Sequence, residues 1–402
     1  MKEKYTLQVN LSSVGIEENR IISFNKRNEL HYSFRVQEEG CLGVHYQIGE
    51  MEDDEGYARA GQNLALKRPY PFMLETGRRS RDKTERVFTD RQLMDIAGEA
   101  LEHVHSLHPD FTLKGNFLQS IIYSGQENDR GLDYSNRDCN TDFNFSFKHK
   151  DSRELSDGWF SIGQRDFDPQ KLYAMADNYL TGFGIREELP GEILVQMQYY
   201  DLLGQLTWSL NAENMCLGTS LLSGRVGEKV FADHFSLAHD VSDEECWNTP
   251  FFDGEGVTQE GDRLPYIENG VVLRGYADKR TAAKYGVEHT GSAFRTHSDI
   301  PNNGNVNLRI QRSDKTIREL LDGRLSIVPV RYSGGFNEKG EWVMPVQMAY
   351  LCDGERLLGR LPEFTLVSSM FDMFGKDFIG VGSDNPVFND KSILVRMNLG
   401  KN

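Results

Sequence analysis

The chain has 402 residues, a formal net charge of −16, and 38% hydrophobic and 11% aromatic residues. This length allows two or three domains with sizeable cores, and no apolar run reaches the roughly 18 residues that would predict a membrane span. We therefore expect no membrane insertion. Because so acidic a surface repels phosphate backbones, we do not expect direct binding of nucleic acid either.

The N-terminal segment predicts an antiparallel sheet. Residues 5–11 alternate apolar and polar side chains, which is typical of a half-buried strand. Further strands are expected at residues 21–24, 31–36 and 43–48, with turns at residues 25–28 and 38–40. Short connections of this kind join strands in an antiparallel meander.

Two helices are predicted next. The first carries Tyr57 and Leu64 on one face. The second begins at a capping-box pattern, in which Thr89 is the N-cap and Gln92 reaches back to it. Apolar residues then continue at helical spacing as far as Leu107. Helices that pack on an antiparallel sheet give an α+β fold.

The chain is predicted to divide near a third helix. Asp168 followed by Pro169 is typical of a helix start, and apolar residues continue to Leu180. We expect an N-terminal α+β domain at residues 1–175 and a β-rich C-terminal domain at residues 176–402. In the second domain, strands are expected at residues 193–197, 325–332, 342–352, 363–368 and 392–397, and a helix at residues 199–210.

Residues 249–295 predict short strands joined by glycine turns. Asn269-Gly270 is a strong hairpin signal, because both residues tolerate positive φ angles. A short helix at residues 278–285 is expected to end at Gly286.

Four pieces of this segment occur in a specific order. They are the turn Asp253-Gly254-Glu255-Gly256, the hairpin at residues 266–276, the helix at residues 281–286, and the stretch at residues 289–295. In this order they resemble the C-terminal region of the TldD/PmbA family, whose members are named modulators of DNA gyrase and are linked to peptide maturation. The chain departs from the pattern at Thr258-Gln259, where Pro-Thr is usual, and at Ser292, where Asn is common.

One branch of this family, the TldD-like proteins, carries the motif His-Glu-x-x-x-His on a helix. Its two histidines bind a metal, and its glutamate would activate the metal-bound water. The corresponding positions here are Leu203, Gly204 and Trp208, none of which can ligate a metal or transfer a proton. The resemblance therefore implies the PmbA (TldE-like) branch, with no metal or cofactor of its own.

Some residues remain candidates for a site. Thr290, Gly291 and Arg295 could contact a peptide backbone, the alternative being a glycine turn beside a surface arginine. Asp253 and Glu255 are interpreted as structural, because they belong to the shared turn.

A rival metal site would bring His234, His239 and Asp253 together from separate segments, although an acidic loop is the simpler interpretation of the histidines' neighbourhood. Cys216 is predicted to be buried, and His103, His105 and His108 to lie on a solvated helix face.

The resemblance implies pairing with a TldD-like metalloprotease in a complex that trims peptides, in which this chain completes the peptide channel rather than cleaving. Whether it has an activity of its own stays open. The alternatives are an independent metallopeptidase with unusual ligands and a stand-alone homodimeric peptide-binding protein.

The chain has five scattered cysteines without a Cys-x-x-Cys pair, and its N-terminus has no signal-peptide core. These features predict a reduced cytoplasmic protein.

Overall fold

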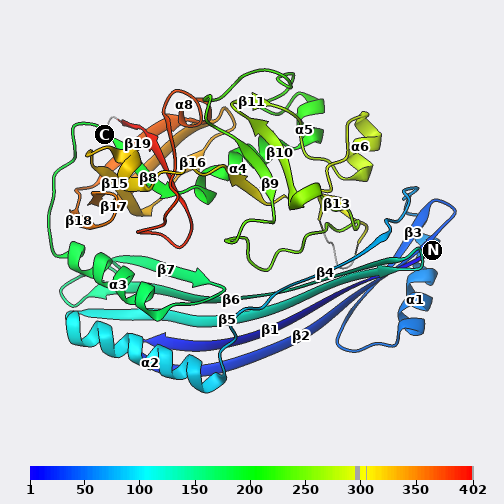
Figure 1. The fold of residues 1–402 in the computed structure, drawn as a ribbon, viewed down its shortest axis with the longest axis horizontal. Helices are drawn as coiled ribbons and strands as arrows, with labels where there is room; N and C mark the ends of the chain where they lie inside the picture. Colours follow the sequence, from blue (N-terminus) through cyan, green and yellow to red (C-terminus); the bar gives the residue numbers. More distant parts are fainter. Residues whose placement is uncertain (295–298, 305, 401–402) are drawn as a thin grey trace.

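The computed structural model describes residues 1–294, 299–304 and 306–400. In Figure 1, a long curved sheet from the first part of the chain lies beneath a β-rich second part. The chain crosses from one part to the other at the end of the molecule where α3 lies.

The long sheet has the order β3-β2-β1-β5-β6-β4, and β7 also pairs with β6. All of its pairs are antiparallel except β4 with β6. The strands are β1 Lys2–Glu17, β2 Arg20–Glu38, β3 Cys41–Ile48, β4 Gly77–Lys83, β5 Phe111–Asn128, β6 Leu132–His149 and β7 Gly158–Gln164.

The predicted antiparallel meander is confirmed, but the turn predicted at residues 25–28 is wrong. β2 is one continuous strand, in which Asn25 pairs with Ser13 of β1 and Asn28 pairs with Asn10. Residues 25–28 are exposed. The strand therefore carries polar side chains on its surface, and these imitate the composition of a turn.

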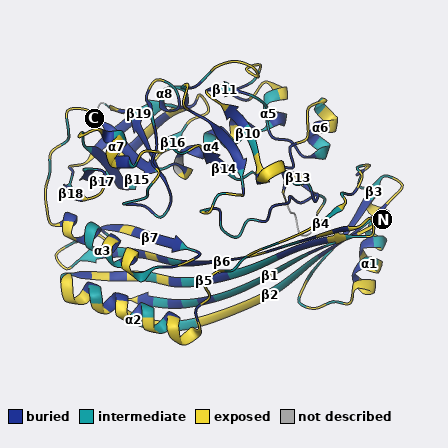
Figure 2. Ribbon diagram, in the orientation of Figure 1, coloured by how far each residue is buried: buried dark blue, intermediate teal, exposed yellow. Residues whose placement is uncertain are grey.

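Two helices cover one face of the sheet at one end (Figure 1), namely α2 Asp90–Leu107 and α3 Pro169–Phe183. Strand alternation puts Phe143, Phe145 and Phe147 of β6 on a common face, and all three join the apolar core that includes both helices. The outward side of α2 is exposed (Figure 2). The capping box at Thr89 and Gln92 is confirmed.

The opposite face of the sheet is covered at its other end by the second part of the chain. Leu132 and Tyr134 belong to the alternate positions of β6 and pack into a smaller core with Phe251 and Phe252. The ring centroids of Tyr134 and Phe251 lie 5.3 Å apart. The second part therefore rests on the sheet through the segment that begins the acidic turn.

Among the described residues, the second part contains a nine-stranded sheet of order β20-β21-β8-β15-β17-β19-β22, with β16 and β18 paired to β17. A four-stranded sheet β11-β10-β9-β14 and the pair β12-β13 complete it. The strands are β8 Leu194–Gln198, β9 Leu237–Asp240, β10 Arg263–Glu268, β11 Val271–Val272, β12 Ala293–Phe294, β13 Asn302–Asn303, β14 Leu308–Ile310, β15 Ser326–Tyr332, β16 Gly335–Phe336, β17 Glu341–Cys352, β18 Leu357–Arg360, β19 Phe364–Ser369, β20 Phe378–Val381, β21 Ser392–Arg396 and β22 Asn398–Leu399.

The remaining helices are short. They are α1 Asp53–Gln62, α4 Tyr200–Ser209, α5 Ala212–Leu217, α6 Lys279–Tyr285, α7 Ile317–Leu321 and α8 Met370–Met373, with 3-10 turns at Asn63–Leu66 and Glu260–Asp262. In the described part of the chain, no helix combines the length and apolar character needed to cross a membrane.

The predicted α+β class is confirmed, and so is the Asn269-Gly270 hairpin between β10 and β11. Gly270 has a φ of 80°, and a Cβ there would lie 2.3 Å from the carbonyl oxygen of Phe231, so the turn requires glycine.

The division predicted between residues 175 and 176 falls inside α3. The apolar core around α3 is shared by the two parts, because Phe147 of the long sheet and Tyr350 of the nine-stranded sheet both belong to it. The Tyr350 hydroxyl also donates to the carbonyl oxygen of Tyr179, at 2.9 Å. The division of the chain into two domains stays a prediction.

Replacing Thr89 by alanine is expected to lower the free energy of unfolding by about 1 kcal/mol, because the backbone N–H of Gln92 loses its acceptor. Thr89→Ser keeps a hydroxyl in place and should remain within about 0.5 kcal/mol of the wild type. Urea titration followed by circular dichroism measures both. If the two variants lost stability equally, the cap would not be the cause.

Candidate functional site

The three positions that the sequence resemblance compares with the metal motif of TldD-like proteins lie on α4. Leu203 is 5% exposed and belongs to the largest apolar core, whereas Trp208 is 42% exposed and Gly204 also lies at the surface. An aliphatic side chain, a hydrogen and an indole N–H offer no lone pair to a metal. These residues therefore do not fit a metal site of that kind.

Asp253 organises the acidic turn at residues 253–256 and is 2% exposed. One carboxylate oxygen accepts hydrogen bonds from the N–H groups of Glu255 and Val257, at 2.8 and 2.9 Å. The other accepts from the N–H of Ala293, at 2.9 Å. The carboxylate thus holds the turn closed and fastens it to β12.

Glu255 links the same turn to two other segments. It is 3% exposed, and it accepts hydrogen bonds from the Tyr70 hydroxyl at 2.5 Å and from the N–H of Lys279 at 3.1 Å. Burial, and then the neighbouring Asp253 carboxylate, raise the pKa of Glu255 to about 8. The protonated form of Glu255 is therefore favoured up to a higher pH than for an exposed glutamate.

Arg35 of β2 connects the long sheet to this turn. Its guanidinium donates to the carbonyl oxygen of Gly254 at 2.6 Å and to the Glu3 carboxylate at 2.9 Å. The side chains of Arg35 and Glu3 are each 3% exposed. Because a buried ion pair that loses one partner leaves an uncompensated charge, this contact strongly favours one arrangement of sheet and turn.

Thr290 and Gly291 lie inside the same assembly. Thr290 is 2% exposed, and its hydroxyl accepts from the N–H of Ala277 at 2.8 Å and contacts the Ser292 hydroxyl at 2.7 Å. Gly291 is also buried and has a φ of 59°. Both residues therefore shape the loop from within. Arg295, the third candidate for peptide contact, lies outside the described residues.

Two large apolar side chains are exposed beside this buried assembly. Phe294, which follows the residue held by Asp253, is 52% exposed, and Met73 is 65% exposed. The Lys279 ammonium donates to the carbonyl oxygen of Met73, at 2.9 Å. Sequence analysis missed Met73, Tyr70 and Arg35, because the residues they contact lie about 180 positions or more further along the chain.

The three residues of the rival metal site have separate roles. His239 is buried in β9, its Nδ1 accepts from the N–H of Asn307 at 3.0 Å, and burial lowers its pKa to about 4. His234 is exposed and contacts the carbonyl oxygen of Phe378 at 3.2 Å. Within the described residues, no three His, Cys, Asp or Glu side chains form a group that could hold a metal ion.

Two smaller expectations need correction. Cys216 is exposed rather than buried, because the short helix α5 turns it away from the core that its apolar neighbours suggested. His103 and His108 do not both point to solvent, because the ring nitrogens of both contact one carboxylate oxygen of Asp177 in α3, at 3.0 and 2.8 Å.

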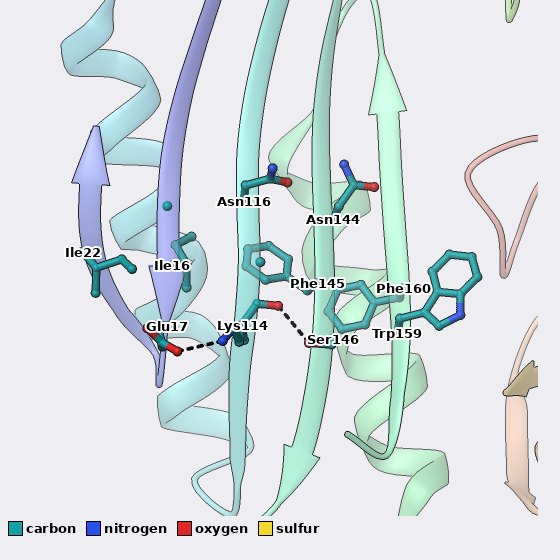
Figure 3. Close-up of a pocket in the computed structure, with 12 residues that line it drawn as sticks. Ile16, Glu17, Ile22, Lys114, Asn116, Asn144, Phe145, Ser146, Trp159 and Phe160 are labelled. Atoms are coloured by element: carbon teal, nitrogen blue, oxygen red, sulfur yellow. Dashed lines mark hydrogen bonds and ion pairs between the residues drawn. The ribbon is translucent and has the colours of Figure 1, made fainter. Parts of the chain in front are cut away.

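A pocket of about 550 Å³ lies on the long sheet (Figure 3). Its polar residues include Lys114 and Glu17, which form an ion pair at 2.8 Å, and Trp159 stands at its edge, 43% exposed. None of the residues singled out from the sequence lines it. The candidate functional site is therefore the buried turn together with the exposed side chains of Phe294 and Met73, which we call the exposed rim.

The family model for the PmbA/TldA metallopeptidase C-terminal domain matches residues 193–395. A metalloprotease TldD homolog of Buchnera aphidicola is 24% identical over 163 residues, which are 40% of this chain and 33% of that protein. The match spans less than half of the length of each of the curated relatives.

Solved structures match over nearly the whole chain. TldE from Thermococcus kodakarensis superposes with a TM-score of 0.79 at 16% identity, covering 99% of this chain and 96% of that one. A proposed modulator of a DNA gyrase from Thermotoga maritima superposes with a TM-score of 0.79 at 22% identity, covering 99% and 95%. At these identities the likeness shows the fold alone.

The raised pKa of Glu255 makes stability depend on pH. Its folded pKa of about 8 lies above the ordinary value of 4.5, so the stability from its protonated form is full below about pH 4.5 and is lost as the pH rises through 8. Glu255→Gln stays neutral, so its stability relative to the wild type should improve between about pH 5 and pH 8.5.

Chemical unfolding at a series of pH values measures this difference. Glu102→Gln removes an exposed carboxylate on α2 and serves as the control, for which the difference from the wild type should stay constant. A constant difference for Glu255→Gln as well would contradict the assignment of a protonated Glu255.

Proposed function

The chain belongs to the PmbA/TldD family, and we propose that it is a non-catalytic, PmbA- or TldE-like subunit in cytoplasmic peptide maturation. A TldD-like metalloprotease would supply the metal and its activated water, and this chain would complete the peptide channel. The observation that carries the proposal is the set of residues on α4, where Leu203, Gly204 and Trp208 replace two ligands and a general base.

The chemistry of peptide hydrolysis makes this replacement decisive for the proposal. A metallopeptidase needs side chains that hold the metal with one position left open, and a carboxylate that takes a proton from the bound water. Leu203 is packed into the largest apolar core, so its position serves folding instead. The functions left for this chain are to bind the peptide, to orient it and to control its access to the partner's active site.

The exposed rim offers a surface for such binding. Phe294 and Met73 present apolar side chains, while the backbone at each is tied to the buried turn through Ala293 or Lys279. Apolar side chains on a rigid support bind the apolar residues that an unfolded peptide exposes, because little ordering is needed. Thr290 and Gly291 would support this surface from beneath.

The independent metallopeptidase is less favoured than the subunit. His239 already uses Nδ1 to accept from a backbone N–H, and both oxygens of Asp253 accept backbone hydrogen bonds. A homodimeric peptide-binding protein would use the same rim as the subunit and would differ from it only in its partner. The reconstitution experiment described below distinguishes these two alternatives.

Phe294→Ala should weaken the binding of an unfolded apolar peptide by about fivefold, because roughly 1 kcal/mol of apolar burial is lost. Met73→Ala should act in the same direction. Leu155 is fully exposed elsewhere in the molecule, and Leu155→Ala is the matched control. Fluorescence anisotropy of a labelled peptide measures the affinities, and unchanged binding in both rim variants would exclude this surface.

Mixing the two purified proteins tests whether this chain or the TldD-like protein is the catalytic subunit. The purified chain is expected to cleave no peptide, and a mixture with a TldD-like protein from the same organism should cleave in a chelator-sensitive way. Replacing the motif glutamate of the TldD-like protein by glutamine should abolish the activity of the mixture. Chelator-sensitive cleavage by this chain alone would contradict the proposal, and a stable homodimer that ignores the second protein would favour the peptide-binding alternative.

A further inference from the structure

A second pocket, of about 510 Å³, lies where the end of the long sheet and the end of α3 meet the nine-stranded sheet. In Figure 1 this is the end of the molecule that carries α3, β17 and β18, far from α6 and β13 beside the acidic turn. Its size suits a small molecule rather than a protein segment. No part of the proposed function uses it.

Three arginines line this pocket, namely Arg186, Arg331 and Arg360. Arg186 and Arg360 are direct neighbours, because their backbones form a parallel bridge in which the N–H of Glu187 donates to the carbonyl oxygen of Arg360 at 2.9 Å. Burial, and then the charge of Arg186, lower the pKa of Arg360. The two guanidinium groups therefore repel one another across the pocket wall.

The Arg360 side chain is held in a fixed plane. Its guanidinium lies over the ring of Phe183, 3.5 Å from the centroid, and its buried Nε–H has no hydrogen-bond partner. Stacking on an aromatic face leaves the edge of a guanidinium available to a planar acceptor. An unpaired buried donor has a cost that a ligand oxygen would remove.

Among the described residues, neither Arg186 nor Arg360 forms a direct ion pair within 4.0 Å. The Asp157 carboxylate, which lines the same pocket, attracts the Arg360 guanidinium and compensates its charge in part. Four carboxylates line the same pocket, those of Asp151, Glu154, Asp157 and Glu363, of which Asp157 and Glu154 have other partners. Asp157 accepts from the N–H of His149 at 2.7 Å and from the Ser152 hydroxyl at 2.6 Å, and Glu154 faces Arg331 at 3.6 Å.

We infer that this pocket binds the oxyanion group of a small ligand, a carboxylate or a phosphate, between the guanidinium groups of Arg186 and Arg360. Paired arginines recognise both groups through bidentate, charge-assisted hydrogen bonds. Met348 and Leu361, both largely buried, also line the pocket and make part of its wall apolar. Arg331, whose guanidinium donates to the carbonyl oxygen of Ser156 at 2.9 Å, borders the same space.

The test is isothermal titration calorimetry on the full chain at constant ionic strength, with three probes. These are inorganic phosphate, an N-acetylated dipeptide with a free carboxylate, and the same dipeptide with a C-terminal amide. Saturable binding of phosphate or of the free acid, with none of the amide, is expected. Whichever of the two binds more tightly identifies the oxyanion.

Arg186→Gln and Arg360→Gln should each weaken that binding by about tenfold or more, the loss of one charge-assisted contact. Arg225 also lies over an aromatic ring, that of Phe371 at 5.1 Å, but outside the pocket. Arg225→Gln therefore removes the same charge and should bind as the wild type does. Arg186 is exposed, so its replacement leaves folding intact if Arg360→Gln does not fold.

The inference is overturned if neither oxyanion binds saturably, or if all three variants lose affinity equally, since the effect would then be one of net charge. These measurements use the isolated chain and no peptidase activity. Failure here would leave the proposed subunit role untouched, and failure of that role would leave the oxyanion site standing.

Discussion

The buried acidic turn at residues 253–256 fixes the arrangement of the two parts at the end of the long sheet away from α3. Asp253 closes the turn with three backbone hydrogen bonds, and Arg35 and Tyr70 reach it from the first part of the chain. A carboxylate and a guanidinium removed from water are stable only while each keeps its partners. The long sheet, the turn and the β12 segment are therefore positioned together.

The fixed position of the buried turn favours the exposed rim as a binding surface. A surface loop usually loses conformational entropy when it binds, and that loss reduces affinity. Here the backbone at Phe294 and Met73 is already held by contacts of the buried turn. Their apolar side chains are therefore preorganised, and less conformational entropy is lost on binding. Leu203, Gly204 and Trp208 on α4 offer no metal ligand, whereas Phe294 and Met73 are held ready for contact. The proposed subunit role requires this combination.

Much of the fold could be predicted from local pattern. The capping box at Thr89, the Asn269-Gly270 hairpin and the α+β class all follow from short-range chemistry that the structure repeats. The continuous strand β2 was missed because exposed polar residues on a strand resemble a turn in composition. The ligand positions of α4 could be compared because the family motif is contiguous, whereas Tyr70 and Glu255 are 185 residues apart and no local signal joins them. The pair Arg186 and Arg360 could not be predicted either, because only the folded chain brings these two segments side by side.

In the proposed assembly, this chain contributes peptide binding and a second protein contributes the metal. The most direct measurement is a tagged purification from the native host, with mass spectrometry of the co-eluting proteins and a metal assay on both the complex and the separated chain. We expect a co-eluting protein with the His-Glu-x-x-x-His motif, and metal in the complex that stays with that protein after separation. Stoichiometric metal bound to this chain alone would show that the subunit role is wrong.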